Sequence, residues 1–317
     1  MEGGQKAMAT YVMGEIHGCF REFKRMMNKI GFSDEDKMLL VGDYIDRGEF
    51  SIDMLKWLEK CPKNVYPVKG NHDVDFAEYV RIMRRVDVME DMRTDENSNE
   101  SSLLLYDKVI ELIDLRDRIL KAQSIKEQKV AQAAKEGIYL TIDEVEDEFE
   151  YDKDNIPAEL EENVEAFDKF GTISDYLNNR GGTLKELNKW AFMLSSYPYF
   201  YKFTINGREV VVVHAGFPAN PTDIPLKFKD VQDFYLHARA ESIRFGGIRG
   251  GIVVAGHTPT IARKMYCFTG GRVYKHESVE KDCTFYNVDC GCCYREVSPF
   301  GKMCCLRLDD EEIFYLD

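Results

Sequence analysis

Five apolar runs of the chain each end in a short polar segment whose side chains can bind a metal ion or transfer a proton. These segments are GEIHG (14–18), GDYIDRG (42–48), GNHD (70–73), HAG (214–216) and GHTP (256–259). In an open α/β sheet, ligands bind beyond the carboxyl ends of the strands, so segments far apart in sequence can meet in one crevice. A single histidine after a strand is more often structural. Four of the chain's six histidines lie in such places beside carboxylates and an asparagine, and together they predict one shared site.

The types of donor atom in these segments predict a centre with two metal ions. Imidazole nitrogens combined with carboxylate and amide oxygens suit Mn, Fe or Zn better than Mg or Ca. The candidate ligands are too many for one ion, so we expect two ions that share the carboxylate of Asp43 at a separation of about 3.5–4 Å. A water molecule between two such ions loses a proton near neutral pH and can attack phosphorus in line.

The elements that must position these residues follow an alternating pattern in the first part of the chain. Apolar runs predict strands at 8–13, 37–43 and 64–71, with a helix at 20–30 between the first two and another at 52–58 between the last two. Apolar residues recur at helical spacing in the first of these helices. This βαβαβ order implies parallel strands flanked by helices.

The remainder of the chain divides into a helical part and a β part. After Pro198, apolar runs at 208–216, 251–260, 284–292 and 302–310 predict strands. Between about 76 and 190 there are no comparable runs. We therefore predict one α/β catalytic domain, residues 8–317, with a helical and acidic insertion at about 76–175. Within the insertion, the composition of residues 103–134 predicts a helix.

The net charge of −14 is concentrated in one segment of the insertion. Residues 143–168 hold thirteen acidic residues and one lysine, so the rest of the chain is close to neutral. A nucleic-acid partner requires a basic face, which the sequence lacks, and we expect no such partner. No apolar run approaches the roughly 20 residues that span a membrane. We interpret the acidic run as a solvated surface rather than a docking site for a basic protein.

The N-terminus and the cysteines indicate the compartment. Residues 1–7 have no apolar signal core, and we expect them to be a remnant of added sequence ahead of a native start at Met8. Nine cysteines without a signal peptide suggest reduced thiols in the cytoplasm. Six of them lie between Cys283 and Cys305, but their spacing matches no paired CxxC zinc site. We interpret these six as buried thiols that act as small apolar groups.

In their order and spacing, GEIHGC, GDYIDRG, GNHD, HAG and GHTP resemble the signature of the calcineurin-like metallophosphoesterases. The resemblance is greatest to the phosphoprotein phosphatase branch with its bacterial and phage members, and it covers about 11–73 and 179–308. It implies an α/β (α+β) metallophosphoesterase fold, in which a central β-sandwich of two mixed sheets is flanked by helices.

The same resemblance implies a ligand set for each metal. One ion would be held by Glu15, His17 and Asp43. The other would be held by Asp43, Asn71, His214 and His257. We expect two divalent ions, Mn²⁺ in the first place, with Fe or Zn as alternatives.

Further residues carry catalytic roles in the resemblance. His72 would be the general acid that protonates the leaving oxygen, oriented by Asp46, and Arg47 would bind phosphate. A second phosphate-binding arginine would be Arg239 in YLHAR, where His237 stands at a position that is commonly tryptophan, with Arg244 as the alternative.

Two secondary matches lie outside the metal set. The turn NNRGG (178–182) is similar to a family turn near the substrate and assigns Asn179 to phosphate binding, with Arg180 inserted. NVDCGC (287–292) resembles an N-I-D-T-G segment, with Cys290 in place of threonine.

The resemblance implies hydrolysis of a phosphoprotein or a small phosphorylated molecule. A protein Ser/Thr phosphatase is the leading hypothesis, and a dinucleoside tetraphosphate hydrolase is the second. The third is a binding module on an attenuated phosphatase fold. It rests on Glu15, because the family carries aspartate there and glutamate adds about 1.5 Å of reach. A shift of about 1 Å at a catalytic centre can cost on the order of 10²-fold in rate.

Overall fold

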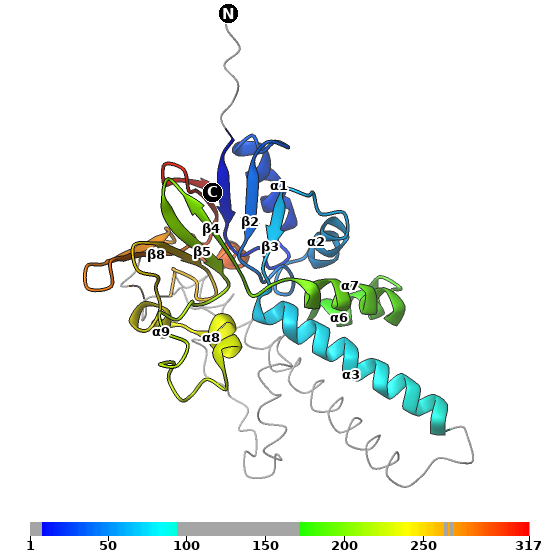
Figure 1. Ribbon diagram of the computed structural model, residues 1–317. Helices are drawn as coiled ribbons and strands as arrows, with labels where there is room; N and C mark the ends of the chain where they lie inside the picture. The colour runs from blue at the N-terminus through cyan, green and yellow to red at the C-terminus, as the bar shows by residue number, and fades with distance from the viewer. Residues whose placement is uncertain (1–7, 94–170, 263–265, 267–268, 317) are drawn as a thin grey trace, which may run out of the picture. The chain divides into compact units, whose positions relative to one another are not determined.

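The computed structural model describes residues 8–93, 171–262, 266 and 269–316 (Figure 1). The chain forms two compact units. The first comprises Met1–Asp73 with Ser195–Asp317, and the second comprises Val74–Leu194. The first contains all the strands that the structure describes. The expected remnant at 1–7 lies outside the described residues.

The first sheet of this unit carries the predicted parallel core. Its strand order is β10-β9-β1-β2-β3, in which β1 pairs in parallel with β2 and β2 with β3, while β9 is antiparallel to both β1 and β10. The strands are β1 (Thr10–Met13), β2 (Lys37–Leu40), β3 (Val65–Pro67), β9 (Met303–Arg307) and β10 (Glu312–Leu316). Helices α1 (Phe20–Lys29) and α2 (Ser51–Leu58) form the two crossovers, as the sequence pattern predicts.

The second sheet has the order β4-β5-β6-β8-β7. Its central strands β5, β6 and β8 are parallel, and both edge strands are antiparallel to their neighbours. The strands are β4 (Phe200–Ile205), β5 (Arg208–Val213), β6 (Ile252–Ala255), β7 (Tyr274–Ser278) and β8 (Cys283–Asn287). The crossover from β5 to β6 contains two short helices, α8 (Val231–His237) and α9 (Ala240–Arg244).

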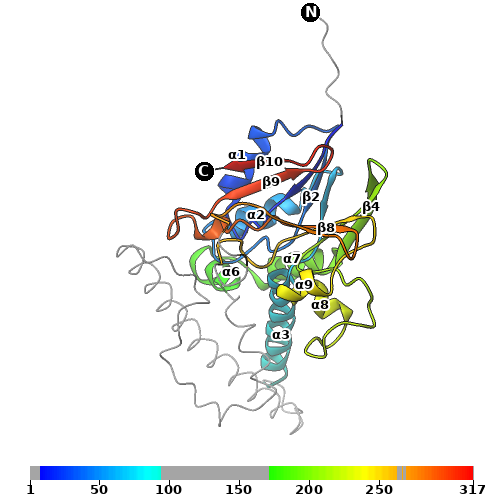
Figure 2. The same ribbon diagram turned by 90° about the vertical axis from the view of Figure 1, so that its left-hand side faces the viewer.

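The main hydrophobic core lies between the two sheets. Val12, Leu39 and Leu306 of the first sheet share one buried cluster with Val212 and Val254 of the second. Because side chains alternate along a strand, each sheet buries one face in this layer. The arrangement confirms the predicted sandwich of two mixed sheets, and Figure 2 shows both sheets from the side.

The outer faces are covered by the helices. Helix α1 packs against β9 and β10. On the second sheet, Val211 and Val213 face outward and form a separate cluster with Tyr235 of α8 and Ile243 of α9. Burying side chains of this size contributes roughly 1.5–3 kcal/mol each. The crossover helices are therefore fixed to the sheet whose strand ends carry His214 and His257.

The burial of the cysteines supports the interpretation that they act as small apolar groups. All eight cysteines among the described residues are free thiols, and six of them are buried. Cys290 and Cys304 belong to the core between the sheets. Burial raises the pKa of the Cys304 thiol well above its ordinary value.

The second unit is helical where the structure describes it. It contains the greater part of α3 (Asn71–Arg93), then α6 (Gly171–Ser174), a π-helical turn at Asp175–Asn179, and most of α7 (Leu184–Ser196). Tyr176 packs on Trp190 with ring centroids 4.7 Å apart. The predicted helix at 103–134 and the acidic run lie outside the described residues. In the part of the chain that is described, no helix has the length and apolar character to cross a bilayer.

Candidate metal centre

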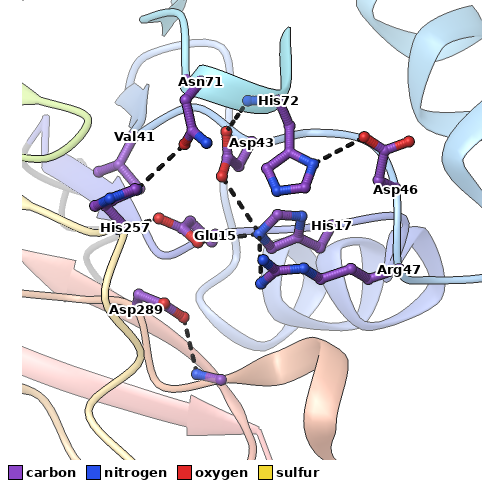
Figure 3. Close-up of polar contacts among 12 residues, drawn as sticks. Glu15, His17, Val41, Asp43, Asp46, Arg47, Asn71, His72, His257 and Asp289 are labelled. Carbon is purple, nitrogen blue, oxygen red and sulfur yellow. Dashed lines mark hydrogen bonds and ion pairs between the residues drawn. The ribbon is translucent and has the colours of Figure 1, made fainter. Parts of the chain in front are cut away.

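Five loops at the carboxyl ends of strands form the candidate site. The loops follow β1, β2 and β3, which are neighbours in the first sheet, and β5 and β6, which are neighbours in the second. Parallel strands present their carboxyl ends at the same edge, which is why these loops meet. Figure 3 shows labelled side chains from the loops after β1, β2, β3 and β6 directed toward one another.

The backbone of these loops is unusual. Eight described residues other than glycine have φ between 41° and 71°, and five of them belong to the predicted site: His17, Asp43, Asp46, Arg47 and His257. Such residues seldom adopt positive φ, and strain of this kind costs about 1–3 kcal/mol per residue and concentrates at functional sites. The surrounding fold must therefore hold these side chains in position.

Two glycines let the loops approach closely. A Cβ atom on Gly70 would lie 2.1 Å from Asp43 Oδ1, and one on Gly256 would lie 2.7 Å from Glu15 Oε1. Neither position has room for a side chain. The glycines that precede the polar residues in the GNHD and GHTP segments are therefore required by packing against the candidate ligands.

One group of donor atoms gathers around His214. Its Nε2 lies 2.8 Å from Asn71 Oδ1, 3.1 Å from His257 Nδ1 and 3.6 Å from Asp43 Oδ2. Its Nδ1 donates a hydrogen bond to the carbonyl oxygen of Val41 at 2.8 Å. In the neutral ring this bond leaves the lone pair on Nε2, which is the arrangement of a metal-binding histidine. The four residues predicted to hold the second metal are thus brought together.

A second group gathers around His17. Its Nε2 lies 3.2 Å from Glu15 Oε2 and 3.4 Å from Asp43 Oδ2. Its Nδ1 donates to the carbonyl oxygen of Ile45 at 2.9 Å, which again leaves the lone pair on Nε2. The carboxylate of Asp43 is close to both histidines, as the prediction of a shared ligand requires.

Glu15 connects the two groups. Its Oε1 accepts a hydrogen bond from the backbone N–H of His257 and lies 3.7 Å from His214 Nδ1. The additional methylene group of glutamate gives this reach. The carboxylate therefore lies between a loop of the first sheet and a loop of the second.

The electrostatics of the site fit bound cations. Glu15 and Asp43 are 3% and 2% exposed. Burial, followed by the charge of Asp43, raises the pKa of Glu15 to about 8, although the His257 N–H and Arg47 act to lower it. Burial lowers the pKa values of His17 and His214, which keeps their rings neutral. Buried carboxylates next to neutral imidazoles have a high desolvation cost that a cation between them would offset.

Asp289 is a site residue to which the sequence assigned no role. It follows β8, is 3% exposed, and lies close enough to Glu15 to influence the pKa of that side chain. Its Oδ1 accepts from the Gly291 N–H at 2.9 Å. Burial and the charge of Glu15 raise its pKa well above the ordinary value. The segment NVDCGC resembles a family motif. Its position beside Glu15, however, depends on how the two sheets pack and could not be predicted from the sequence.

Asp73 is the second such residue and organises the backbone. Its carboxylate accepts hydrogen bonds from the N–H groups of Asp43 at 2.9 Å, Tyr44 at 3.2 Å and Gly70 at 2.8 Å. Its side chain is fully buried. It therefore ties the loop after β2 to the loop after β3.

His72 has the geometry expected of a general acid. Its Nδ1 donates to Asp46 Oδ2 at 2.8 Å, and its backbone N–H donates to Asp43 Oδ1 at 3.0 Å (Figure 3). The His17 and His72 rings meet edge to face with centroids 4.7 Å apart. Asp46 thus holds Nδ1 of the ring and fixes the direction of Nε2.

The three arginines considered for phosphate binding lie at different positions relative to the candidate metal ligands. Arg47 Nη1 is 3.5 Å from His17 Nε2, and its guanidinium lies 5.6 Å from the centre of the Tyr294 ring. Arg239 Nη1 donates to Thr258 Oγ1 at 3.3 Å, next to His257. The alternative, Arg244, is exposed and lies against Phe245 at the end of α9. The structure thus brings Arg239 to the centre.

Asn179 belongs to the second unit. It is exposed, and its Nδ2 donates to Asp175 Oδ1 at 3.0 Å. Arg180 forms an ion pair with the other oxygen of Asp175 at 2.7 Å. A role for Asn179 in phosphate binding stays a prediction.

Comparison with known proteins gives a family match. The family model "Calcineurin-like phosphoesterase" matches residues 8–290.

Among curated relatives, symmetrical bis(5'-nucleosyl)-tetraphosphatases match part of the chain. The protein of Haemophilus ducreyi is 43% identical over 68 residues, which are 21% of this chain and 25% of that protein. The protein of Buchnera aphidicola is 37% identical over 99 residues, 31% of each chain. The matches thus span only a quarter to a third of these relatives.

Solved structures show weaker likeness. A putative diadenosine tetraphosphatase has a TM-score of 0.44 at 15% identity, with 98% of this chain and 94% of that chain covered. A serine/threonine phosphatase of Saccharomyces cerevisiae also has a TM-score of 0.44, at 14% identity, with 99% and 80% covered.

Proposed function

The chain belongs to the calcineurin-like phosphoesterase family, and we propose that it is a two-metal hydrolase whose substrate is a dinucleoside tetraphosphate. One observation carries the two-metal reaction: the buried nitrogen and oxygen donors of five strand-end loops converge on both sides of Asp43. The substrate class is supported by the names of the partial relatives, symmetrical tetraphosphatases.

The residues present fit a pair of divalent cations. Glu15, His17 and Asp43 would hold one ion, and Asp43, Asn71, His214 and His257 would hold the other. The mixture of nitrogen and oxygen donors suits Mn, Fe or Zn better than Mg or Ca, and we propose Mn²⁺ in the first place. When bound, such ions polarise the phosphoryl oxygens and supply an activated water.

The protein's own groups perform the remaining tasks. Arg47 is exposed beside His17 and can hold two phosphate oxygens with its planar guanidinium. His72 can donate the proton at Nε2 to the leaving oxygen while Asp46 holds Nδ1. A positioned acid of this kind typically contributes 10²–10⁴-fold. Arg239 can bind phosphate on the side of His257.

A substrate panel tests the proposal. Metal-stripped protein is supplied with Mn²⁺ and incubated with diadenosine tetraphosphate, a phosphoserine peptide and p-nitrophenyl phosphate. Symmetrical hydrolysis consumes one water and yields two ADP, which chromatography resolves from AMP and ATP. We expect ADP as the product and a much higher kcat/KM for the tetraphosphate than for the peptide. Efficient release of phosphate from the peptide alone would contradict the proposed substrate.

A protein Ser/Thr phosphatase is the second candidate. It is favoured by the HAR element, whose Arg239 the structure places beside Thr258, and by the resemblance of NNRGG to the phosphoprotein branch. The same panel discriminates between the two, because this candidate requires turnover of the phosphoserine peptide with little production of ADP.

A further inference from the structure

His237 lies beside the candidate metal centre without a role in the reaction described above. It is the last residue of α8, and its ring meets the His257 ring edge to face, with centroids 6.1 Å apart. The N–H of Ala215, which follows His214, donates to the carbonyl of Tyr235 at 2.8 Å. The end of α8 is therefore fixed next to two of the candidate metal ligands.

Asp233 orients the His237 ring. Its Oδ1 is 2.6 Å from His237 Nδ1, one helical turn away, and its Oδ2 accepts from the Lys229 N–H at 2.9 Å. A carboxylate can only accept, so Nδ1 is the donor in this pair. The His237 side chain is 42% exposed, and Nε2 is the ring nitrogen left for a ligand.

The surroundings of His237 contain a further cationic group. Arg239 follows two residues later, is exposed, and donates to Thr258 next to His257. Its own backbone N–H is held by Glu241, which pairs with Lys227 at 2.8 Å. The short connection between α8 and α9 thus presents a histidine and an arginine on the side of the centre where His257 lies.

We infer that His237 is a substrate-binding residue that donates a hydrogen bond from Nε2 to the phosphoryl group adjacent to the one that is hydrolysed, with Asp233 as its positioning residue. This rests on the proposed function, because only a substrate with linked phosphoryl groups places a second one next to the centre. A histidine ring with a proton on each nitrogen can donate through both, which here would serve Asp233 and the substrate. A hydrogen bond between charged groups is among the strong ones.

Ligand binding tests the inference without turnover. Calorimetry on the Mn²⁺-loaded protein, with equal free Mn²⁺ in cell and syringe, measures methylenediphosphonate, which has two phosphoryl groups, and methylphosphonate, which has one. We expect His237→Ala to weaken binding of the two-group ligand about tenfold more than binding of the one-group ligand. Asp233→Asn should shift the same ratio in the same direction by about threefold, since it acts only through the ring orientation.

The matched control is His276→Ala, a histidine of β7 that stacks on Tyr274. It should leave both affinities unchanged. Equal weakening of the two ligands in His237→Ala, or no weakening, would overturn the inference, and an unchanged ratio in Asp233→Asn would remove the positioning role. Absence of diadenosine tetraphosphate turnover in the unaltered protein would overturn the proposed substrate instead. Because the two phosphonate affinities are measured without turnover, the failure of the inference can be distinguished from the failure of the proposed substrate.

Discussion

At the scale of single residues, the site depends on side chains that the fold holds in costly states. Glu15 is buried with a raised pKa, His17 and Asp43 have left-handed backbone, and Asp289 is buried against Glu15. Each of these is unfavourable for an isolated residue. Together they fit the preformed shell for cations that we propose.

Replacing Glu15 tests the residue that departs from the family pattern. Its Oε1 is bound to the His257 N–H, which draws the carboxylate toward the second sheet. We expect Glu15→Asp to release this contact, tighten Mn²⁺ binding beside His17, and raise kcat by up to about 10²-fold. Manganese titration and kcat measurements check both effects. Weaker binding together with slower turnover would show that the glutamate is the fitted ligand, and unchanged values would show that the additional methylene group is immaterial.

The raised pKa of Glu15 predicts a pH dependence for protein stripped of metal. An acid with a pKa of about 8 in the folded state and 4.5 in the unfolded state binds more protons when folded, so stability falls as pH rises through this interval. The lowered pKa values of His17 and His214 act in the opposite direction, but only below their ordinary value of 6.5. Between pH 6.5 and 8, therefore, the free energy of unfolding should decrease.

Urea unfolding at several pH values measures this decrease, which should reach about 1–2 kcal/mol across that interval. Glu15→Gln, which has no charge to bury, should reduce it, and the raised pKa values of Asp289 and Asp73 act in the same direction and account for the remainder. A slope that is unchanged in Glu15→Gln would assign the whole effect to other groups.

At the scale of elements, three parallel strands of the first sheet and two of the second are followed by the predicted ligands, and buried polar groups hold the loops together. Asp73 is the clearest case, with three backbone N–H donors from the loops after β2 and β3. This connection brings Asp43, in the loop after β2, close to Asn71 and His72, which follow β3.

Asp73→Asn should therefore loosen both loops at once. The amide would direct N–H groups toward backbone donors, and an unsatisfied buried group costs about 1–3 kcal/mol. We expect a loss of unfolding free energy in this range, with Mn²⁺ affinity lower by about 10–100-fold. Urea unfolding and a manganese titration measure the two effects. Loss of stability with unaltered metal affinity would confine Asp73 to a structural role.

Much of this arrangement could be predicted from the sequence. The βαβαβ pattern and the strands β5, β6, β8 and β9 have strong apolar runs, and each of the five polar segments follows a strand end. The edge strands β4, β7 and β10 were harder to recognise, because partly exposed strands such as YKHES mix charged and apolar residues. The predicted strand at 64–71 was too long: β3 ends at Pro67, and Asn71 already begins α3.

The candidate site was predictable to a similar degree. The metal-binding set follows from residue types at strand ends. The positions of Asp289 beside Glu15 and of His237 beside His257 depend on how the two sheets pack, which no local pattern encodes. The left-handed conformations of His17, Asp43 and Asp46 also escape prediction, because these residues adopt them only when the surrounding structure requires it.

At the scale of the whole molecule, the first unit contains all the predicted metal ligands, whereas the second unit contains Asn179. The division into one catalytic domain with an insertion stays a prediction. The acidic run at 143–168 accounts for most of the net charge of −14, and its composition is typical of a solvated surface.

Deleting residues 143–168 tests this interpretation of the acidic run. Because the predicted ligands all lie outside it, we expect kcat for p-nitrophenyl phosphate to change less than about twofold. Steady-state kinetics with thermal unfolding as the control for folding provides the measurement. A collapse of this activity in a folded protein would show that the segment contributes to catalysis.

We propose that turnover depends on two cations held on either side of Asp43, and a joint measurement of metal content and turnover checks this dependence. Metal-stripped protein is titrated with Mn²⁺ while bound metal per chain and hydrolysis of diadenosine tetraphosphate are both followed, for the unaltered chain and for Asp43→Asn. We predict that turnover rises as occupancy approaches two ions per chain, and that Asp43→Asn reduces both occupancy and turnover, the latter by at least about 100-fold. Full turnover by the metal-stripped protein, or unaltered occupancy and turnover in Asp43→Asn, would contradict the claim.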